Sequence, residues 1–467
     1  MPTNKVTTRF APSPTGLMHL GNVRTALLNW LFARKHSGRF LLRFEDTDAD
    51  RSQTEYIEAI RRDLDWLSLD RDGTELFQSA HADKHRQALE QLAETGLAYR
   101  CFCSEHQLAL DRRLAASRGL PPRYAGRCRV LPVSEADARA ANEPFVWRLA
   151  VHDDGDASEV VVHDALRGDV CFARRDLDDP VVSRSDGSFT FLLPNAVDDA
   201  LDAISHVLRG DDHLTNSAYQ VWLLVQLGHV PPVYLHHGLL LGEDGSKLSK
   251  RSGSHSVTEL RDAGLLPDAL VQAMVRLGHA NMPEDADIDA LMEYFEPQHM
   301  SASAVRWQDD ELWRWHTRLL HALPVAQLLP RLQAILPDAN DGFAHLVQGN
   351  LQRVEDALHF RRLLDAHADL DSDALVAAQQ AGEDFYTAAL AAWQDVGQTQ
   401  VAAVWKAWAD AIKAATGVKG RGLFMPLRVA LSGATHGPEM SHIVEFLGVS
   451  GVETRLQDMQ ARVSKWV

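Results

Sequence analysis

The first fifty residues predict a strand–loop–helix–strand unit, and no other segment constrains the fold of this chain as strongly. Residues 6–11 form a short apolar run, and Pro12 and Pro14 exclude a helix directly after it. Apolar residues then recur at spacings of three and four, as in an amphipathic helix: Val23, Leu27, Trp30 and Leu31. Residues 40–44 form a second apolar run. Strands joined by a helix in this way pair in parallel, with a right-handed crossover.

Ligands of parallel sheets gather at the carboxyl ends of the strands, which here are residues 11–22 and 45–48. Gly21 lets a nucleotide approach the backbone closely. The helix that follows presents free N–H groups and a positive dipole end to an anion. His19 can donate a hydrogen bond to a phosphate or sugar oxygen. A nucleotide site is therefore predicted here, although the motif alone also fits a Pro/Gly turn with an incidental histidine.

A second motif lies far along the chain, at residues 245–251, in a loop rich in glycine and serine. Lys247, Lys250 and Arg251 concentrate positive charge on a flexible tether. Such a loop can close over a triphosphate and follow its charge as pyrophosphate leaves. Taken alone, the motif would fit a solvated surface loop better.

Together, in this order, the two motifs resemble the paired "HIGH" and "KMSKS" signatures of class I aminoacyl-tRNA synthetases. Residues 10–21 and 247–251 look like the glutamyl/glutaminyl branch, and residues 42–48, 206–210 and 423–431 match it further. The resemblance implies ATP-dependent ligation of L-glutamate to the 3′ end of tRNA(Glu) through a glutamyl-adenylate, with AMP and pyrophosphate as products. ATP would bind with Mg²⁺ at these positions: Pro12, Thr15, Gly16, His19, Gly21, Asn22, Lys247, Leu248, Ser249, Lys250 and Arg251.

A glutamate pocket must satisfy one ammonium group and two carboxylates, and arginine suits carboxylate because it can bind it in bidentate fashion. The resemblance implies Arg9 and Arg209 for this role and Glu45 as the acceptor of the ammonium group. Ser13 and Asn195 match polar positions that complete the pocket. The remaining pocket position departs from the family pattern, because Phe191 stands where most relatives have a tyrosine.

Three of the four cysteines fall in one short stretch, which raises the question of a metal site. The spacing resembles a zinc knuckle in the acceptor-binding insertion of some relatives, whose final histidine falls at Val130 here. A paralogous group uses a tyrosine instead, which makes the candidate ligands Cys101, Cys103, Tyr124 and Cys128. A degenerate, metal-free site is the alternative. The fourth cysteine, Cys171, lies in an apolar strand-like run and is expected to be a small core residue.

Length and composition place the chain among multidomain soluble proteins. Its 467 residues suit about three domains. The net charge of −17 argues mildly against nucleic acid as a partner, although phosphate contacts depend on local patches. No apolar run is long enough to span a membrane, and no signal peptide is recognisable. We therefore expect a cytoplasmic enzyme without a membrane partner, and a monomer by family resemblance.

The expected fold is an α/β N-terminal half, with a Rossmann-like parallel sheet and an α+β insertion, followed by an all-α C-terminal half. Residues 54–96 are helical in pattern, as is nearly everything after 256. The predicted domains are two catalytic halves (1–99 and 196–255), the acceptor-binding insertion (100–195), a helical stem-contact domain (256–322) and an anticodon-binding domain (323–467).

The C-terminal helices carry basic residues that could meet the anticodon arm of a tRNA: Lys413, Lys419 and Arg421, beside residues 423–431. A helix-bundle core with a solvated edge is the alternative. Glu311 and His316 stand where the family pattern has lysine and asparagine, so contacts from residues 301–316 to the tRNA stem are not expected to follow that pattern.

Four other functions share some of these sequence features. A glutaminyl enzyme is disfavoured by the helical C-terminal half, and a shorter paralogue that glutamylates a modified tRNA base lacks such a half. A small-molecule nucleotidylyltransferase shares a His-x-Gly motif but needs no 200 further helical residues. A catalytically inactive tRNA-binding protein would not need the lysines of the second motif.

Overall fold

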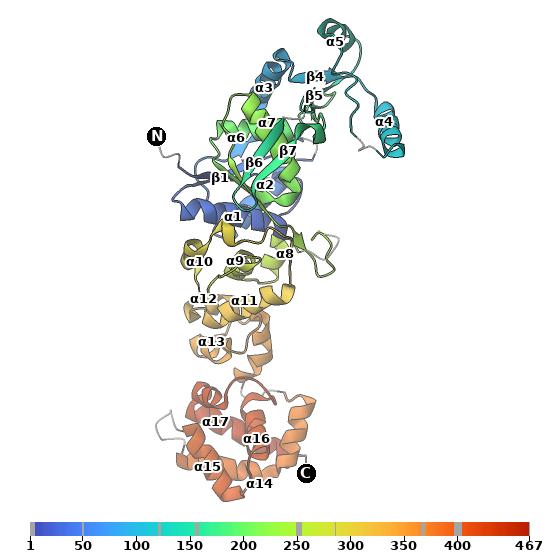
Figure 1. Cartoon of the computed structure of the whole chain (residues 1–467). Coiled ribbons are helices and arrows are strands. Elements are labelled where there is room, and N and C mark those ends of the chain that lie inside the picture. Colours follow the sequence, from blue (N-terminus) through green and yellow to red (C-terminus); the bar gives the residue numbers. More distant parts are fainter. Residues whose placement is uncertain are drawn as a thin grey trace. The chain divides into compact units, whose positions relative to one another are not determined.

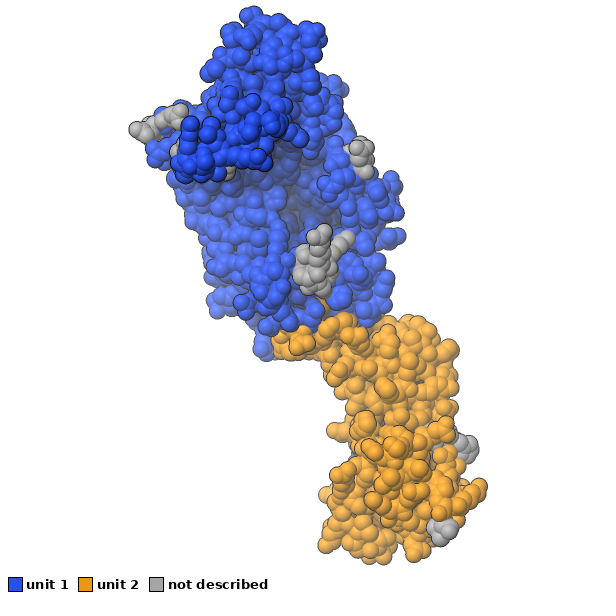
Figure 2. All heavy atoms as spheres, turned by 90° about the vertical axis from the view of Figure 1, so that its right-hand side faces the viewer, with its two compact units in different colours: residues 1–309 blue, residues 310–467 orange. Residues whose placement is uncertain are grey.

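The computed structural model describes residues 5–48, 51–119, 123–153, 155, 158–248, 255–284, 286–365, 369–396 and 404–466. The chain divides into two compact units, residues 1–309 and 310–467, which are distinguished by colour in Figure 2. The first unit contains all the described strands, and the second is helical (Figure 1). The expected fold class, an α/β N-terminal half and an all-α C-terminal half, is confirmed.

The predicted strand–helix–strand unit is present at the start of the chain. Strands β1 (Thr7–Phe10) and β2 (Arg39–Phe44) pair in parallel, and α1 (Leu20–Lys35) connects them. A short third strand, β3 (Leu76–Phe77), pairs in parallel with β2. It interrupts the stretch 54–96, which was expected to be helical throughout and instead contains α2 (Thr54–Trp66) and α3 (Ala82–Glu94).

A second sheet has the strand order β7 (Gly168–Ala173), β6 (Glu159–Asp164), β10 (Val233–His237), β9 (His206–Gly210). Strands β6, β10 and β9 are parallel, and β7 is an antiparallel edge strand. The segment before β9 adjoins β1, because the Ser205 N–H donates to the Thr7 carbonyl at 3.0 Å and the Thr7 N–H donates to Ser205 Oγ at 2.8 Å. The carboxyl ends of β1 and β9 therefore open at one edge.

Cys171 is exposed, so the expectation of a small core residue was wrong. The apolar texture of its segment reflects a strand, but that strand lies at the edge of the sheet. Its partner β6 lies between β7 and β10 and buries Val160 and Val162.

A third sheet of three antiparallel strands has the order β4 (Ala98–Cys101), β5 (Val146–Leu149), β8 (Val181–Ser183). Two helices in the connections, α4 (Glu105–Ser117) and α5 (Val133–Ala140), bury none of their residues. The first unit also contains α6 (Leu192–Leu201), α7 (Leu214–Gln226), β11 (Leu240–Leu241), α8 (Val257–Asp262), α9 (Pro267–Arg276), α10 (Ile288–Tyr294) and β12 (Val305–Arg306).

Helix α1 packs against β1, β2 and β9. Helices α3, α6 and α7 supply a core to which the sheets contribute Leu41, Val162, Val207 and Tyr234. Buried apolar area of this kind stabilises by roughly 25 cal/mol per Å². This packing holds the strand ends that carry the polar residues of the site.

The second unit consists of α11 (Asp309–Ala322), α12 (Val325–Gln333), α13 (Asp341–Gln348), the 3₁₀ segment η6 (Val354–Leu363), α14 (Ser372–Val396), α15 (Val404–Thr416), α16 (Arg421–Ser432) and α17 (Met440–Ser464). Helices α14 and α17 are each kinked at a glycine with positive φ, Gly382 at 77° and Gly448 at 63°. Glycine adopts such angles without the penalty that a Cβ imposes. No helix in the described part of the chain is both long and apolar enough to cross a membrane.

Candidate active site

A cleft of about 860 Å³ lies in the first unit, at the carboxyl ends of β1, β2 and β9. Residues from both sequence motifs line it: Pro12, Thr15, Gly16, His19, Gly21, Asn22, Lys247 and Leu248. The six candidate glutamate-binding residues line it as well: Arg9, Ser13, Glu45, Phe191, Asn195 and Arg209. Segments more than 220 residues apart in the sequence thus meet around one cavity. The remaining candidates, Ser249, Lys250 and Arg251, lie outside the described residues.

His19 caps the N-terminus of α1. Its Nδ1 accepts hydrogen bonds from the backbone N–H groups of Gly21 (3.1 Å) and Asn22 (3.4 Å), while Asn22 Oδ1 accepts from the His19 N–H at 3.2 Å. This reciprocal capping resembles a capping box in which histidine replaces serine or threonine. Because Nδ1 is the acceptor, the ring proton lies on Nε2, which is a donor for a phosphate oxygen.

Lys247 follows the short strand β11 and pairs with Leu241 in an isolated bridge. Its ammonium group lies 2.7 Å from Asp212 Oδ2, so a carboxylate holds it at the cleft. Beyond the second motif the chain returns to the first, because His19 pairs with Ser256 and the Val257 N–H donates to the Met18 carbonyl at 3.0 Å. Lys247 within the second motif and Ser256 beyond it are thereby both tied to the walls of the cleft.

Arg9 is buried and already occupied by a carboxylate within the protein. Its Nε and Nη2 donate to the two oxygens of Asp199 at 3.1 and 3.3 Å. Asp199 also pairs with the fully buried Arg43, whose Nη2 lies 2.7 Å from Oδ1. The pKa of Asp199 is lowered, although its burial acts to raise it, because both arginines favour the anion. One edge of Arg9 is therefore committed to Asp199, which leaves Nη1 for a ligand.

Glu45 stands just after β2, with its carboxylate inside the cleft. Asn195 Nδ2 donates to Oε1 at 2.5 Å, and Ser13 Oγ donates to Oε2 at 3.4 Å. Burial raises the pKa of Glu45, and the nearby Arg43 and Arg9 partly oppose that shift. A carboxylate with a raised pKa gains stabilisation when a cationic group approaches it.

Arg209, in β9, is 6% exposed and lines the cleft. Its Nη2 donates to Ser217 Oγ at 2.6 Å and to Gln220 Oε1 at 2.5 Å, and its guanidinium lies 5.3 Å from the centre of the Tyr234 ring. Burial lowers the pKa of Arg209 to about 10, so it remains a cation at neutral pH. Nearby, the centres of the Phe191 and His213 rings are 5.5 Å apart, and the Phe191 side chain contributes no polar group.

Sequence reasoning did not identify several polar residues of the cleft and its supports: Arg24, Asp199, Asp212, His213, Gln220 and His237. One available signal was Arg43, an arginine within an apolar strand, which implies a buried anion nearby. The carboxylates of α6 were the obvious candidates. Burial also lowers the pKa of His213 to about 4 and that of His237 to about 3, so both are neutral.

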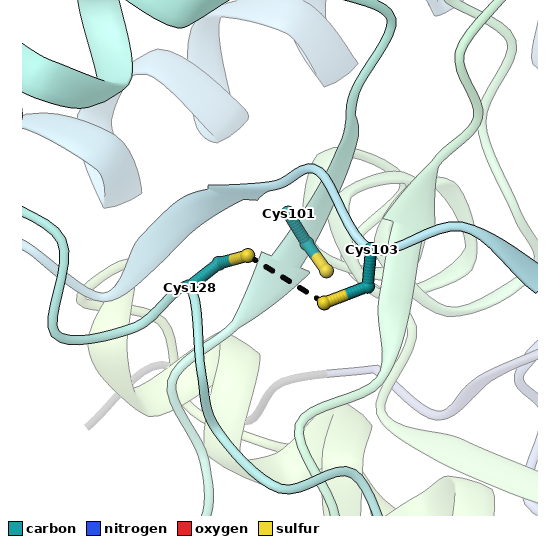
Figure 3. Close-up of side chains that lie close together, drawn as sticks. All are labelled: Cys101, Cys103 and Cys128. Atoms are coloured by element: carbon teal, nitrogen blue, oxygen red, sulfur yellow. Dashed lines mark hydrogen bonds between the residues drawn. The ribbon is translucent and has the colours of Figure 1, made fainter. Parts of the chain in front are cut away.

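The three clustered cysteines lie close together, with their sulfurs directed toward one another (Figure 3). Cys103 and Cys128 Sγ are 3.7 Å apart, and all three sulfurs lie within 4.8 Å. The Tyr124 hydroxyl is 3.4 Å from Cys101 Sγ and 3.8 Å from Cys103 Sγ. A tetrahedral site with Zn–S bonds of about 2.3 Å spaces its sulfurs about 3.8 Å apart, so the cluster fits zinc. Val130 is 82% exposed and has no ligand atom.

Comparison with known proteins agrees with this architecture. A family model described as "tRNA synthetases class I (E and Q), catalytic domain" matches residues 5–314, and one described as "Anticodon binding domain" matches residues 316–460. The chain is 41% identical to "Glutamate--tRNA ligase 1" of Halorhodospira halophila, over 97% of this chain and 96% of the relative. It is 38% identical to "Glutamate--tRNA ligase 1" of Brucella ovis, over 96% of this chain and 99% of the relative.

Among solved structures, a glutamate tRNA ligase from Elizabethkingia meningosepticum in complex with its amino acid is similar, with a TM-score of 0.85 and 26% identity. The match covers 98% of this chain and 100% of that one. The fold is thus that of an aminoacyl-tRNA synthetase of class I. Within this class, the chain belongs to the E and Q family, named for glutamate and glutamine.

Proposed function

We propose that this enzyme ligates L-glutamate to the 3′ end of tRNA(Glu), using ATP and releasing AMP and pyrophosphate. The observation that carries the proposal is the single cleft lined by His19 of the first motif, Lys247 of the second, Glu45 and Arg209. It offers a carboxylate for an ammonium group, a buried guanidinium for a carboxylate, and a helix N-terminus for phosphate. The full-length relatives named as glutamate–tRNA ligases support the choice of glutamate.

The reaction would proceed in two displacements. First, the α-carboxylate oxygen of glutamate attacks the α-phosphorus of ATP, and pyrophosphate leaves with the electrons of the broken P–O bond. Then a ribose hydroxyl of the terminal adenosine attacks the acyl carbon, and AMP leaves. Positioning and charge stabilisation supply most of the acceleration in such reactions. Mg²⁺, when bound to the phosphates, would neutralise part of their charge.

Individual roles follow from the geometry of the cleft. Glu45 would accept the substrate ammonium group, and Arg209 would bind a substrate carboxylate. The N–H groups at the start of α1, with His19 Nε2, would bind phosphate oxygens. The Lys247 ammonium group would leave Asp212 for the triphosphate or bridge the two anions. These roles await mutational tests.

The direct test of the function is glutamate-dependent charging of tRNA(Glu), with tRNA(Gln) and glutamine as controls. The role of the second motif is tested by Lys250→Ala, for which we expect a loss of activation of roughly 10²-fold or more, the scale of one lost transition-state donor. The matched variant Lys250→Arg retains the charge. Near-normal ATP turnover by Lys250→Ala in the presence of tRNA would refute the role.

A zinc ion held by Cys101, Cys103, Tyr124 and Cys128 belongs to the same proposal, because the sulfur spacing suits a tetrahedral site. The ion would tie β4 to the loop around Cys128. Metal analysis of the purified protein tests it directly. We expect close to one equivalent of zinc in the wild type and less in Tyr124→Phe; below 0.1 equivalents in the wild type would end the proposal.

The helical unit is proposed to bind the anticodon arm, as the match to an anticodon-binding family suggests. Exposed Lys419 and Arg421, with Lys413 on α15, are the basic candidates. The five predicted domains remain proposals. Strands β6 and β7 lie in the range assigned to the insertion, yet β6 pairs with β10 of the catalytic range, and β7 pairs with β6. A cytoplasmic location and a monomeric state also remain predictions, which fractionation and light scattering would test.

A further inference from the structure

Behind Arg209, on the side away from the cleft, lies a chain of buried polar side chains from three elements. Ser217 in α7 joins Arg209 to His236 in β10, with 2.6 Å between Ser217 Oγ and His236 Nε2. His236 Nδ1 lies 2.6 Å from Asp164 Oδ2 at the end of β6. Ser217 and His236 are fully buried, and Asp164 is 5% exposed. None of the three lines the cleft.

The direction of each hydrogen bond in this chain can be derived. Asp164 accepts backbone N–H groups from Leu166, Arg167 and His236, and its pKa is lowered although burial acts to raise it. It is therefore an anion that only accepts. Burial lowers the pKa of His236, so the imidazole is neutral, and its one proton lies on Nδ1, facing Asp164.

His236 Nε2 must then be an acceptor, and the Ser217 hydroxyl donates to it. The alternative acceptor, the His213 carbonyl, is farther away at 3.2 Å. With its proton directed to His236, Ser217 presents oxygen lone pairs to Arg209 Nη2. A second branch reaches Arg209 through Gln220, whose Nε2 donates to Asn195 Oδ1 at 2.9 Å, and Asn195 in turn contacts Glu45.

We propose that Asp164, His236 and Ser217 are positioning residues that orient Arg209 for the carboxylate of the amino-acid substrate. The order of side chains is that of a Ser–His–Asp triad, but Ser217 is buried and its oxygen accepts from a guanidinium, which makes it unsuited to nucleophilic attack. The three residues instead fix Nη2. Arg209 lines the cleft, so a carboxylate bound there would meet a guanidinium whose Nη2 is already held in place by Ser217 and Gln220.

This inference rests on the proposed function, and two questions must be separated in its test. Charging of tRNA(Glu) with glutamate by the wild type tests the function. We call the hydrogen-bonded chain Asp164–His236–Ser217 the relay. It is tested by the KM for glutamate and the KM for ATP in variants that retain the fold, as judged by thermal unfolding. A wild type that charges normally beside variants with unchanged KM values would overturn the relay alone. A wild type that charges no glutamate would overturn both.

Ser217→Ala removes one of the two acceptors of Arg209 Nη2. We expect the KM for glutamate to rise roughly 10-fold or more, as for a hydrogen bond to a charged group, and the KM for ATP to stay within about 2-fold. The control is Ser432→Ala in α16, another buried serine, which bonds to the Arg428 carbonyl outside the first unit. It should lower thermal stability without changing the KM for glutamate.

A matched pair at His236 tests the direction of the relay and serves if Ser217→Ala does not fold. The amide of asparagine can replace Nδ1 but not Nε2, whereas that of glutamine can reach the position of Nε2. His236→Asn should therefore raise the KM for glutamate about as much as Ser217→Ala, and His236→Gln should raise it less. Equal rises in the KM values for glutamate and ATP, or no rise above about 2-fold in folded Ser217→Ala or His236→Asn, would contradict the relay.

Discussion

The two units of the molecule treat buried polar groups in opposite ways. Among the described residues, every buried side-chain nitrogen or oxygen without a hydrogen-bond partner lies in the first unit, and Arg24, Arg209 and His85 are examples. In the second unit, Arg455 is buried to 4% exposure, yet it donates to four backbone carbonyls, those of Leu431, Arg362, Leu363 and Asp365.

An unpaired buried polar group costs stability, whereas a saturated one contributes modestly to it. In the helical unit, Arg455 donates to carbonyl groups at the C-terminal ends of η6 and α16, and its role there is structural. The catalytic unit instead has buried side-chain atoms without partners among its described residues, and two of the residues concerned, Arg24 and Arg209, line its cleft.

The largest effect that the comparison predicts is functional and concerns Arg209. Replacing it with methionine, Arg209→Met, removes the guanidinium but keeps an apolar stem of similar length. We expect kcat/KM for glutamate to fall by roughly 10²-fold or more, since a buried charged partner is lost from the site. The free energy of unfolding should fall by less than in Arg455→Met, because two buried acceptors rather than four lose their donor. Unimpaired charging by this variant would show that the substrate carboxylate binds elsewhere.

In the helical unit the same substitution should act on stability. Arg455→Met leaves four buried carbonyl oxygens without their donor, and we expect a cost of about 3 kcal/mol. Differential scanning calorimetry of the full chain measures it. The KM for glutamate should remain at the wild-type value, and a selective rise in that KM without destabilisation would contradict the assignment of Arg455 as a scaffold residue.

Replacing Arg24 should change the free energy of unfolding in the opposite direction to replacing Arg455. Its three guanidinium nitrogens are buried without partners, and burial lowers its pKa to about 10. Arg24→Met removes this desolvated cation, so we expect the free energy of unfolding to rise by about 1 kcal/mol or more. The melting temperature should rise by about 2 °C. A loss of stability as large as that of Arg455→Met would break the distinction between the units.

The smallest predicted effect is a pH dependence. Glu45 must be ionised to accept an ammonium group, and burial raises its pKa. The ammonium acceptor is therefore lost as pH falls through a value above that of an ordinary carboxyl group. The KM for glutamate should begin to rise at mildly acidic pH, while the KM for ATP changes less. In Glu45→Gln the KM for glutamate should be high and independent of pH over the same range.

Local patterns in the sequence predicted the first strand–helix–strand unit and the position of both motifs. Family resemblance then supplied candidates that the structure gathers around one cleft, from Arg9 and Glu45 to Arg209. The residues that hold those side chains were not predictable. Asp164, Ser217 and His236 are far apart in the sequence, and each is ordinary in its own segment. The pairing of β6 with β10 and the packing of α7 against β6 bring them together.

The place of a strand within its sheet also could not be predicted from the sequence, because an edge strand and a central strand can share the same apolar composition. Cys171 illustrates this, as its segment reads like a core strand but lies on β7 at the edge. The commitment of Arg9 to Asp199 also required coordinates. Arginine and carboxylate were each visible in the sequence, but nothing there indicated that they pair with each other.

If glutamate and ATP bind in one cavity, a single molecule that combines parts of both should displace both. A non-reactive analogue of glutamyl-adenylate, with a sulfamoyl group in place of the phosphate, is such a molecule. We expect inhibition that is competitive with glutamate and also with ATP, and much tighter than the binding of either alone. Inhibition competitive with only one of the two substrates would contradict binding in one cavity.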